Sequence, residues 1–269
     1  MHDYEQKLEQ ERRWYQPRSK PFSFFSKLLH HPLVLNPKRL ELSYHFAKES
    51  MSNVLHERIH GTPVENLLIA PCGTGCDYPY VSPYADRVHG IDISDVAVSK
   101  CSPEMITSVG DILASGYPDE SFDAIVSPLF FHHMRRVGFD PFLNEFWRIL
   151  KKNGVLIILE PSLWYPLNVI TRPIKLLNNP YNEVKDEGPF PPGQMMKSMC
   201  QAGYTDISLR AATFSHPLLP VPLSKLVHGI TRPISAIWPC NIMAWMIVFS
   251  AKKGNHRGQP LGEGYRVGT

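Results

Sequence analysis

The sequence lacks a long hydrophobic run, a cysteine-rich framework and a strong charge of either sign. The longest apolar run, Ile242 to Phe249, has the length of a strand, well below the about 18 apolar residues of a membrane-spanning helix. Five cysteines in 269 residues do not indicate a disulfide framework. A formal net charge of +3 is too weak to indicate a nucleic-acid partner. The polar N-terminus has no apolar core of a signal peptide, so we expect a cytoplasmic protein with reduced thiols.

Proline is the residue in surplus, with 25 residues in the chain against a usual share of about 5%. Many prolines fall in 161–193 and in the apolar segment 214–240. Proline interrupts regular structure, so we expect long irregular loops there. Their apolar side chains favour a cap over a bulky or apolar small molecule, and an ordinary hydrophobic cap is the alternative.

Strand-like and helix-like segments alternate after residue 63, which indicates a parallel α/β sheet. The first 62 residues carry no strand signal and predict a helical extension, with helices expected at Glu5–Tyr15 and Leu40–Ile59. We therefore expect a helical extension at 1–62, one domain at 63–253 with cap segments at 161–193 and 214–240, and a flexible tail at 254–269. Strands are expected at 64–70, 87–93, 105–109, 122–129, 154–160, 206–213 and 243–251, and helices at 141–151 and 194–202.

A glycine turn and two acidic residues follow the first three strands. Gly73-Thr74-Gly75 comes directly after the first strand, Asp92 stands near the end of the second, and Asp111 follows the third. A glycine turn lets the backbone approach a ligand closely, and a carboxylate at the next strand end can accept the hydroxyls of a ribose. The carboxyl ends of parallel strands share one edge of the sheet, so these groups predict a nucleotide-type site there.

The stretch 64–160 resembles the class I S-adenosylmethionine-dependent methyltransferases of the small-molecule type. The matching motifs are LLIAPCGTG, GIDIS, VGDI, YPDESFDAIVSPLFFHH and FLNEFWRILKKNGVLIILEP. The resemblance implies a Rossmann-like, doubly wound sheet of seven strands, mostly parallel with an antiparallel last strand. It also implies S-adenosylmethionine as cofactor, since the sulfonium is an activated methyl donor. Two positions depart from the family loop: Ile69 stands at the usual acid and Pro71 at the first glycine.

The resemblance assigns cofactor contacts position by position. Asp92 is expected to hold the ribose, Asp111 the adenine amino group, and Ser127 lies near the transferred methyl. The remaining expected cofactor contacts are Pro71, Cys72, Gly73 and Gly75 at the methionine end, with Ile93 and Ile112 beside the adenine.

The catalytic and substrate candidates follow the fourth and fifth strands. His132 and His133 are candidate general bases for an oxygen nucleophile, with a structural role as the alternative. Glu160, Trp164 and Tyr165 are candidate substrate contacts, and a cap or an ion pair is the alternative for Glu160. We expect no metal ion, because a Cys72–Cys76 cluster would need a third cysteine where Pro79 stands.

These features favour methyl transfer to a small, apolar or bulky molecule, with oxygen favoured over carbon or nitrogen as acceptor. A methyltransferase fold that binds without catalysis is one alternative, supported by Ile69 and Pro71. An NAD(P)-dependent oxidoreductase is another, although Tyr78 replaces the third glycine of its motif. For the aromatic segment Trp14 to Phe25 we favour a lid; a peripheral membrane contact and plain packing are the alternatives.

Overall fold

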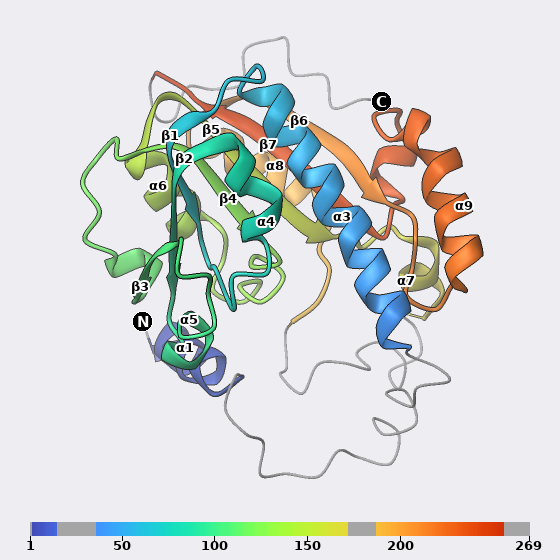
Figure 1. The fold of residues 1–269 in the computed structure, drawn as a ribbon, viewed down its shortest axis with the longest axis horizontal. Coiled ribbons are helices and arrows are strands. Elements are labelled where there is room, and N and C mark those ends of the chain that lie inside the picture. Colours follow the sequence, from blue (N-terminus) through green and yellow to red (C-terminus); the bar gives the residue numbers. More distant parts are fainter. Residues whose placement is uncertain (1, 15–35, 172–186, 256–269) are drawn as a thin grey trace.

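The computed structural model describes residues 2–14, 36–171 and 187–255. A seven-stranded sheet with the order β3-β2-β1-β4-β5-β7-β6 forms its centre, and helices cover both faces (Figure 1). The pairs among β1 to β5 are parallel, whereas β7 runs antiparallel to both β5 and β6. The predicted Rossmann-like, doubly wound sheet with an antiparallel last strand is therefore confirmed. The strands are β1 (Val64–Ile69), β2 (Ala85–Asp92), β3 (Ile106–Val109), β4 (Phe122–Pro128), β5 (Leu150–Pro161), β6 (Tyr204–Thr213) and β7 (Met246–Lys253).

The longer helices begin where the sequence supplies a cap or a proline in the first turn. Asn36 caps α3 (Pro37–Arg58) by accepting a hydrogen bond from the backbone N–H of Lys38 at 2.9 Å, and Pro37 fits the first turn because it lacks an N–H that would stay unpaired there. The other helices are α1 (His2–Trp14), α4 (Tyr78–Val81), α5 (Asp95–Val98), α6 (Asp140–Ile149), α7 (Pro166–Thr171), α8 (Pro192–Gln201) and α9 (Val221–Thr231); short 3-10 turns are η1 (Ser82–Tyr84), η2 (Ile112–Ala114), η3 (Arg232–Ile234) and η4 (Cys240–Ile242).

Two hydrophobic cores lie on opposite faces of the sheet. Met51 and Leu55 of α3 pack with Leu67 and Ile69 of β1 on one face. On the other face, Phe146 of α6 and Met195 of α8 pack against strand residues such as Ile125 of β4. Successive strand residues point to opposite faces, which is why β1 supplies Leu68 to the second core and its neighbours to the first. Both faces are covered, as a mostly parallel sheet requires.

The expectation of irregular structure throughout the proline-rich segments is wrong. Residues 221–231 form helix α9, and 166–171 form the short helix α7. Pro222 stands in the first turn of α9, where a missing N–H breaks no intrahelical hydrogen bond. Proline therefore starts these helices. The expected helix 141–151 also ends earlier, at Ile149, and β5 continues directly from Leu150.

Several sequence predictions fall on residues outside the described ranges. These are most of the expected lid segment Trp14 to Phe25, residues 172–186 of the first cap segment, and residues 256–269 of the expected tail. Among the helices that the structure describes, none is long and apolar enough to span a membrane.

Candidate functional site

The loop after β1 is tied to the end of β2 through Asp92. The backbone N–H of Gly73 donates to Oδ2 of Asp92 at 2.8 Å, and the N–H of Ser94 donates to Oδ1 at 2.9 Å. Asp92 is buried, and burial raises the pKa of its carboxyl group, while the hydrogen bonds from Ser94 and Gly73 act in the opposite direction. The carboxylate thus holds the glycine loop in place and keeps lone pairs for a ligand with hydroxyl groups.

Glycine is required at two places in and beside this loop. Gly75 has a φ of +74°, and a Cβ there would lie 3.2 Å from the Cα of Cys101. A Cβ at Gly90 in β2 would lie only 2.9 Å from the Cβ of Cys72. Side chains at these positions would push the loop away from β2 and its following segment, so the glycines permit the close approach that the loop shows.

Asp111 stands next to Asp92 at the same edge, because Val109 of β3 pairs with Asp92 of β2. Its Oδ1 accepts a hydrogen bond from the backbone N–H of Leu113 at 2.9 Å and so caps the turn η2. The same oxygen accepts a hydrogen bond from the hydroxyl of Tyr4 in α1 at 2.6 Å. Burial and this contact raise the pKa of Tyr4, which keeps the hydroxyl protonated as a donor.

Ser127 lies near the end of β4 and is fully buried. Its Oγ has no hydrogen-bond partner within the described part of the chain. A buried hydroxyl without a partner is costly, which is consistent with a ligand atom at this edge of the sheet. Ile93 and Ile112 follow the ends of β2 and β3, with Ile112 buried and Ile93 partly exposed.

Glu160 in β5 holds the segment that follows β4. Its Oε1 accepts hydrogen bonds from the backbone N–H groups of Phe130 at 2.8 Å and Phe131 at 2.6 Å. Its Oε2 accepts from Nδ1 of His132 at 2.8 Å. The carboxylate is fully buried, so its partners belong to the chain itself. The cap alternative weighed for Glu160 describes its contacts with Phe130 and Phe131, and its role toward a substrate stays a prediction.

His132 is therefore oriented by a carboxylate. Because Nδ1 donates to Glu160, the opposite nitrogen, Nε2, is the basic atom in the neutral ring. A carboxylate that fixes one nitrogen while the other acts as a base is a recurring arrangement in catalysis. The side chain of His132 is 17% exposed, so the ring is neither sealed in the core nor free in solvent.

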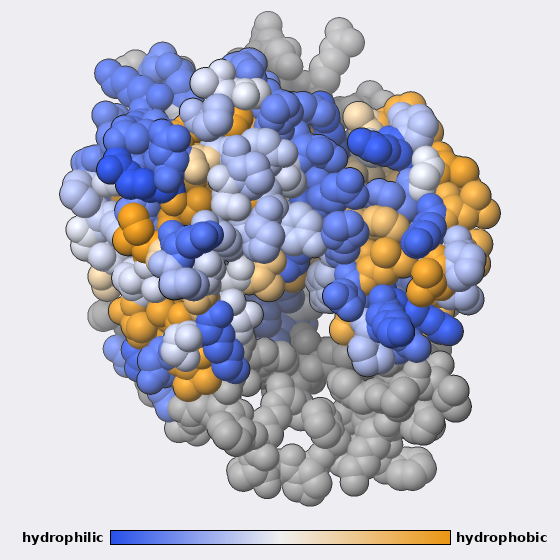
Figure 2. Space-filling model, viewed as in Figure 1, coloured by the Kyte–Doolittle hydropathy of each residue, from blue (hydrophilic) through white to orange (hydrophobic). Residues whose placement is uncertain are grey.

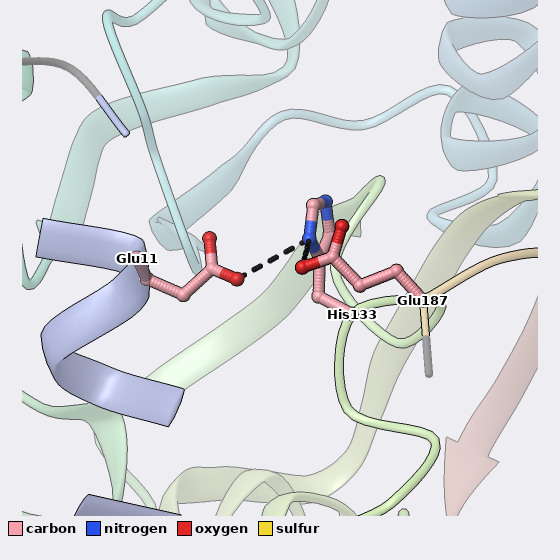
Figure 3. Close-up of side chains that lie close together, drawn as sticks. All are labelled: Glu11, His133 and Glu187. Carbon is pink, nitrogen blue, oxygen red and sulfur yellow. Dashed lines mark ion pairs between the residues drawn. The ribbon is translucent and has the colours of Figure 1, made fainter. Parts of the chain in front are cut away.

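His133 has very different surroundings. Its Nδ1 lies 3.3 Å from Glu11 of α1 and 3.2 Å from Glu187 (Figure 3). Burial by itself would lower the pKa of His133, but the two carboxylates raise it to about 9. Lys7 pairs with Glu11 at 2.8 Å and also with Glu187. The two carboxylates thus favour the protonated form of His133, which is less suited to act as a base.

The cluster of Lys7, Glu11, His133 and Glu187 balances in charge, with two carboxylates facing one ammonium and one imidazolium. The side-chain ligand atoms of Glu11, His133 and Glu187 lie within 4.8 Å of one another, close enough to hold a cation. Lys7 already supplies the positive charge that a metal ion would bring.

Cys72 and Cys76 lie in different surroundings from each other. Cys72 is buried against Gly90, whereas Sγ of Cys76 lies 2.9 Å from Nζ of Lys48.

Trp164 and Tyr165 follow β5 just before α7. Tyr165 stacks on His216, with ring centroids 5.5 Å apart, whereas the Trp164 side chain is exposed. The stack joins the two proline-rich segments, because His216 belongs to the second of them. Whether either aromatic ring touches a substrate stays a prediction.

The structure brings together the predicted groups that follow β1, β2, β3, β4 and β5 at one edge of the sheet. It adds residues that the sequence analysis missed, namely Tyr4, Lys7, Glu11 and Glu187. Figure 1 shows α1 beyond the carboxyl ends of the parallel strands. The charged and polar character of α1 was visible in the sequence, but nothing in the pattern indicated that this helix packs against the edge.

Comparison with known proteins agrees with this geometry. Residues 68–158 match the family model of a methyltransferase domain. A search of curated proteins gives no match.

Solved structures show the same fold at low identity. A methyltransferase from Thermotoga maritima is 20% identical, with 80% of this chain and 93% of that chain covered and a TM-score of 0.55. The geranyl diphosphate C-methyltransferase from Streptomyces coelicolor is 14% identical, with 92% and 98% covered and a TM-score of 0.59. The [4+2]-cyclase SpnF is 18% identical, with 77% and 80% covered and a TM-score of 0.53.

The residues present fit the cofactor of that family. Asp92 offers carboxylate lone pairs at the end of β2, Gly75 permits a tight loop, and Ser127 carries a buried hydroxyl without a partner among the described residues. The oxidoreductase alternative is left without support. The order of the motifs, the sheet that presents them and the matching domain model lead to one conclusion: residues 68–158 form a methyltransferase domain, and the chain has the fold of S-adenosylmethionine-dependent methyltransferases.

Proposed function

We propose that this methyltransferase transfers a methyl group to a small, apolar or bulky molecule, with oxygen favoured as the acceptor over carbon or nitrogen. S-adenosylmethionine, when bound, supplies a methyl group activated by the sulfonium. The observation that carries the preference for oxygen is the pair of His132 and Glu160 beside the end of β4. A hydroxyl acceptor must lose a proton during transfer, and an oriented imidazole can take it.

The cofactor contacts are proposed on the positions that share this edge. Asp92 binds the ribose, Asp111 the adenine amino group, and Ser127 lies close to the reacting end. Asp92 is supported by its buried carboxylate and its position beside the glycine loop. The further proposed contacts are Pro71, Cys72, Gly73 and Gly75 toward the methionine end, with Ile93 and Ile112 beside the adenine.

His132 is the proposed catalytic base, and Glu160 is a positioning residue that fixes its ring. His133 is less suited to the role because Glu11 and Glu187 keep it protonated. We therefore propose that His133 fastens α1 to the edge of the sheet. We further propose that α1 belongs to an extension at 1–62 that acts as a lid on the domain at 63–253, and the contacts of His133 with Glu11 support this proposal.

The substrate is proposed to lie against the cap segments 161–193 and 214–240, with Trp164 and Tyr165 among its contacts. The stack of Tyr165 on His216 shows that the two segments meet. The geranyl diphosphate C-methyltransferase, which binds geranyl diphosphate, aligns over 92% of this chain. That likeness is of fold alone. The composition supports a cytoplasmic location as a further proposal.

An activity assay with single histidine variants tests the proposed chemistry. The full chain is incubated with S-adenosylmethionine and a panel of apolar alcohols, phenols and amines, and the methylated product is measured by mass spectrometry. His132→Gln is expected to lower turnover of a hydroxyl acceptor by about 10²–10⁴-fold, whereas His133→Gln keeps the base and is expected to lower it far less. Full activity of His132→Gln would overturn the base assignment.

Binding of S-adenosylhomocysteine to both variants, followed by calorimetry, is the control for the cofactor site. Cofactor binding without any product from hydroxyl acceptors would contradict the oxygen preference. A chain that binds no cofactor would favour the scaffold alternative, which Ile69 and Pro71 first raised.

A further inference from the structure

Helix α9 has its polar and apolar sides reversed relative to an ordinary surface helix. Leu223, Leu226 and Ile230 are spaced as neighbours on one side of the helix, and all three are exposed, Leu226 at 58% and Ile230 at 64%. A surface helix normally buries such a stripe and turns its polar residues to solvent. The apolar side of α9 therefore faces away from the domain.

The side of α9 that faces the protein is polar. Ser224 is fully buried and hydrogen-bonds to the buried Ser215. His228 stacks on Phe46 of α3, with ring centroids 4.1 Å apart and planes 1° from parallel, and its Nδ1 lies 3.3 Å from Oγ1 of Thr213. These contacts fix the rotation of the helix, so the exposure of its apolar side follows from specific packing.

Two further exposed apolar side chains follow α9 in the sequence. Ile237 and Trp238 are 55% and 49% exposed. The segment that carries them is held to the sheet, because the backbone N–H of Ala211 donates to the carbonyl of Ser235 at 2.7 Å. We call Leu223, Leu226, Ile230, Ile237 and Trp238 the α9 face. Figure 2 shows hydrophobic residues gathered where Figure 1 draws α9, at the right of the view, and further hydrophobic patches on the opposite side.

The charge of this region has one sign. The sequence contains no acidic residue from 207 to 255, whereas Lys225 and Arg232, both exposed, accompany the α9 face. On the inner side, α3 contributes Glu49 near His228, and Glu57, which pairs with Arg210 at 2.5 Å. Among the described residues, the outward surface of α9 thus combines apolar side chains with the positive charge of Lys225, while Arg232 borders the pocket that α9 forms with Glu57 of α3.

We propose that the α9 face docks onto an anionic lipid surface. An amphipathic helix that lies in the membrane interface buries Leu, Ile and Trp among the acyl chains while Lys and Arg meet the head groups. A second copy of this chain fits less well, because a symmetric contact would bring two copies of Lys225 toward each other, and the described segment 207–255 supplies no acidic residue to pair with them. Docking would place the methyltransferase beside a source of apolar molecules.

Vesicle sedimentation with the full chain tests this proposal. We expect binding to vesicles of phosphatidylcholine with about one third phosphatidylglycerol, and much weaker binding to phosphatidylcholine alone. The double substitution Leu226→Ser with Ile230→Ser is expected to lower the partition coefficient by about tenfold or more. Lys225→Glu is expected to weaken binding to the anionic vesicles selectively.

The matched control is Ile106→Ser with Val109→Ser. These residues of the edge strand β3 are 50% and 55% exposed, close to the exposure of Leu226 and Ile230, but they belong to a different part of the fold. The control is expected to bind vesicles like the wild type. Circular dichroism and S-adenosylhomocysteine binding show whether each variant is folded.

Three results would overturn the proposal. One is equal binding to neutral and anionic vesicles, and another is equal loss of binding in the α9 and β3 variants. The third is a dimer in light scattering that dissociates on Leu226→Ser with Ile230→Ser while the wild type binds no vesicle, which would identify a second copy as the occupant.

Discussion

The attachment of α1 to the edge of the sheet is expected to weaken as the pH rises. Glu11 of α1 and Glu187 approach Nδ1 of His133 at 3.3 and 3.2 Å, and together they raise its pKa from 6.5 to about 9. A raised pKa means that protonated His133 stabilises the attached state. This contribution is complete below pH 6.5 and is lost as the pH rises through about 9.

The size of the effect follows from the same contacts. A shift of this size corresponds to about 3.5 kcal/mol, at about 1.4 kcal/mol for each pH unit. Glu187 remains beside His133 when α1 leaves, and the two carboxylates lie at nearly equal distances, so Glu11 accounts for about half. Lys7 leaves with the same helix and removes a positive charge from Glu187, so about 1.7 kcal/mol is the upper limit of the effect. The pKa of Glu11 is lowered to about 2. This shift arises in part from the same pairing with His133, so it is not added to the free energy of attachment. Release of α1 is therefore expected to become roughly tenfold more frequent between pH 6.5 and pH 9.5.

Limited proteolysis measures this release. Arg12 is exposed on α1, and trypsin cleaves after it when the helix opens, at a rate that follows the open population when opening is fast. The rate is divided by that of a free peptide with the sequence of α1, which removes the pH dependence of trypsin. His133→Gln is expected to abolish the corrected pH dependence, whereas His56→Gln, at an exposed position of α3, keeps it. A corrected rate that stays flat in the wild type, or a rise that persists in His133→Gln, would refute the reasoning.

Two further predictions concern the buried carboxylates of the site. Asp92→Asn is expected to weaken binding of S-adenosylhomocysteine by roughly 10- to 150-fold, since one charge-assisted hydrogen bond is worth about 1.5–3 kcal/mol. Calorimetry tests this, with Asp95→Asn in the exposed first turn of α5 as control, and unchanged affinity in folded Asp92→Asn would remove Asp92 from the ribose site. Glu160→Ala is expected to lower the free energy of unfolding by about 3–5 kcal/mol, because it leaves the N–H groups of Phe130 and Phe131 without their acceptor. Urea unfolding measures this loss, and a change below about 1 kcal/mol would contradict the anchoring role.

The sheet and the cofactor edge could be predicted because their signals are local. Each strand is a short apolar run, and the glycine loop, Asp92 and Asp111 follow strand ends within a few residues. Parallel pairing brings the carboxyl ends of strands to one edge whatever the details of packing. The order of motifs along the chain was thus enough to place these groups together. It was not enough to distinguish the surroundings of His132 from those of His133, because the two residues are adjacent in sequence.

The prediction for the proline-rich segments was wrong for a physical reason. The effect of a proline depends on its position within a helix, because only the first turn lacks intrahelical acceptors for its N–H groups. Pro222 lies in that turn, and α9 follows it. In the same helix, the apolar side chains do not face the core as their spacing predicts, since Leu226 is exposed while Ser224 is buried.

The sequence by itself determined the fold class, the expected cofactor and the edge of the sheet where the predicted site residues lie. Only the tertiary structure decided that Glu160 orients His132 and that Glu11 and Glu187 surround His133. It also turned the apolar side of α9 to the outside. Strand and loop signals arise between neighbours along the chain. The surroundings of a titratable group depend instead on contacts between residues such as Lys7 and Glu187, which are 180 positions apart, and these contacts form only when the whole domain packs.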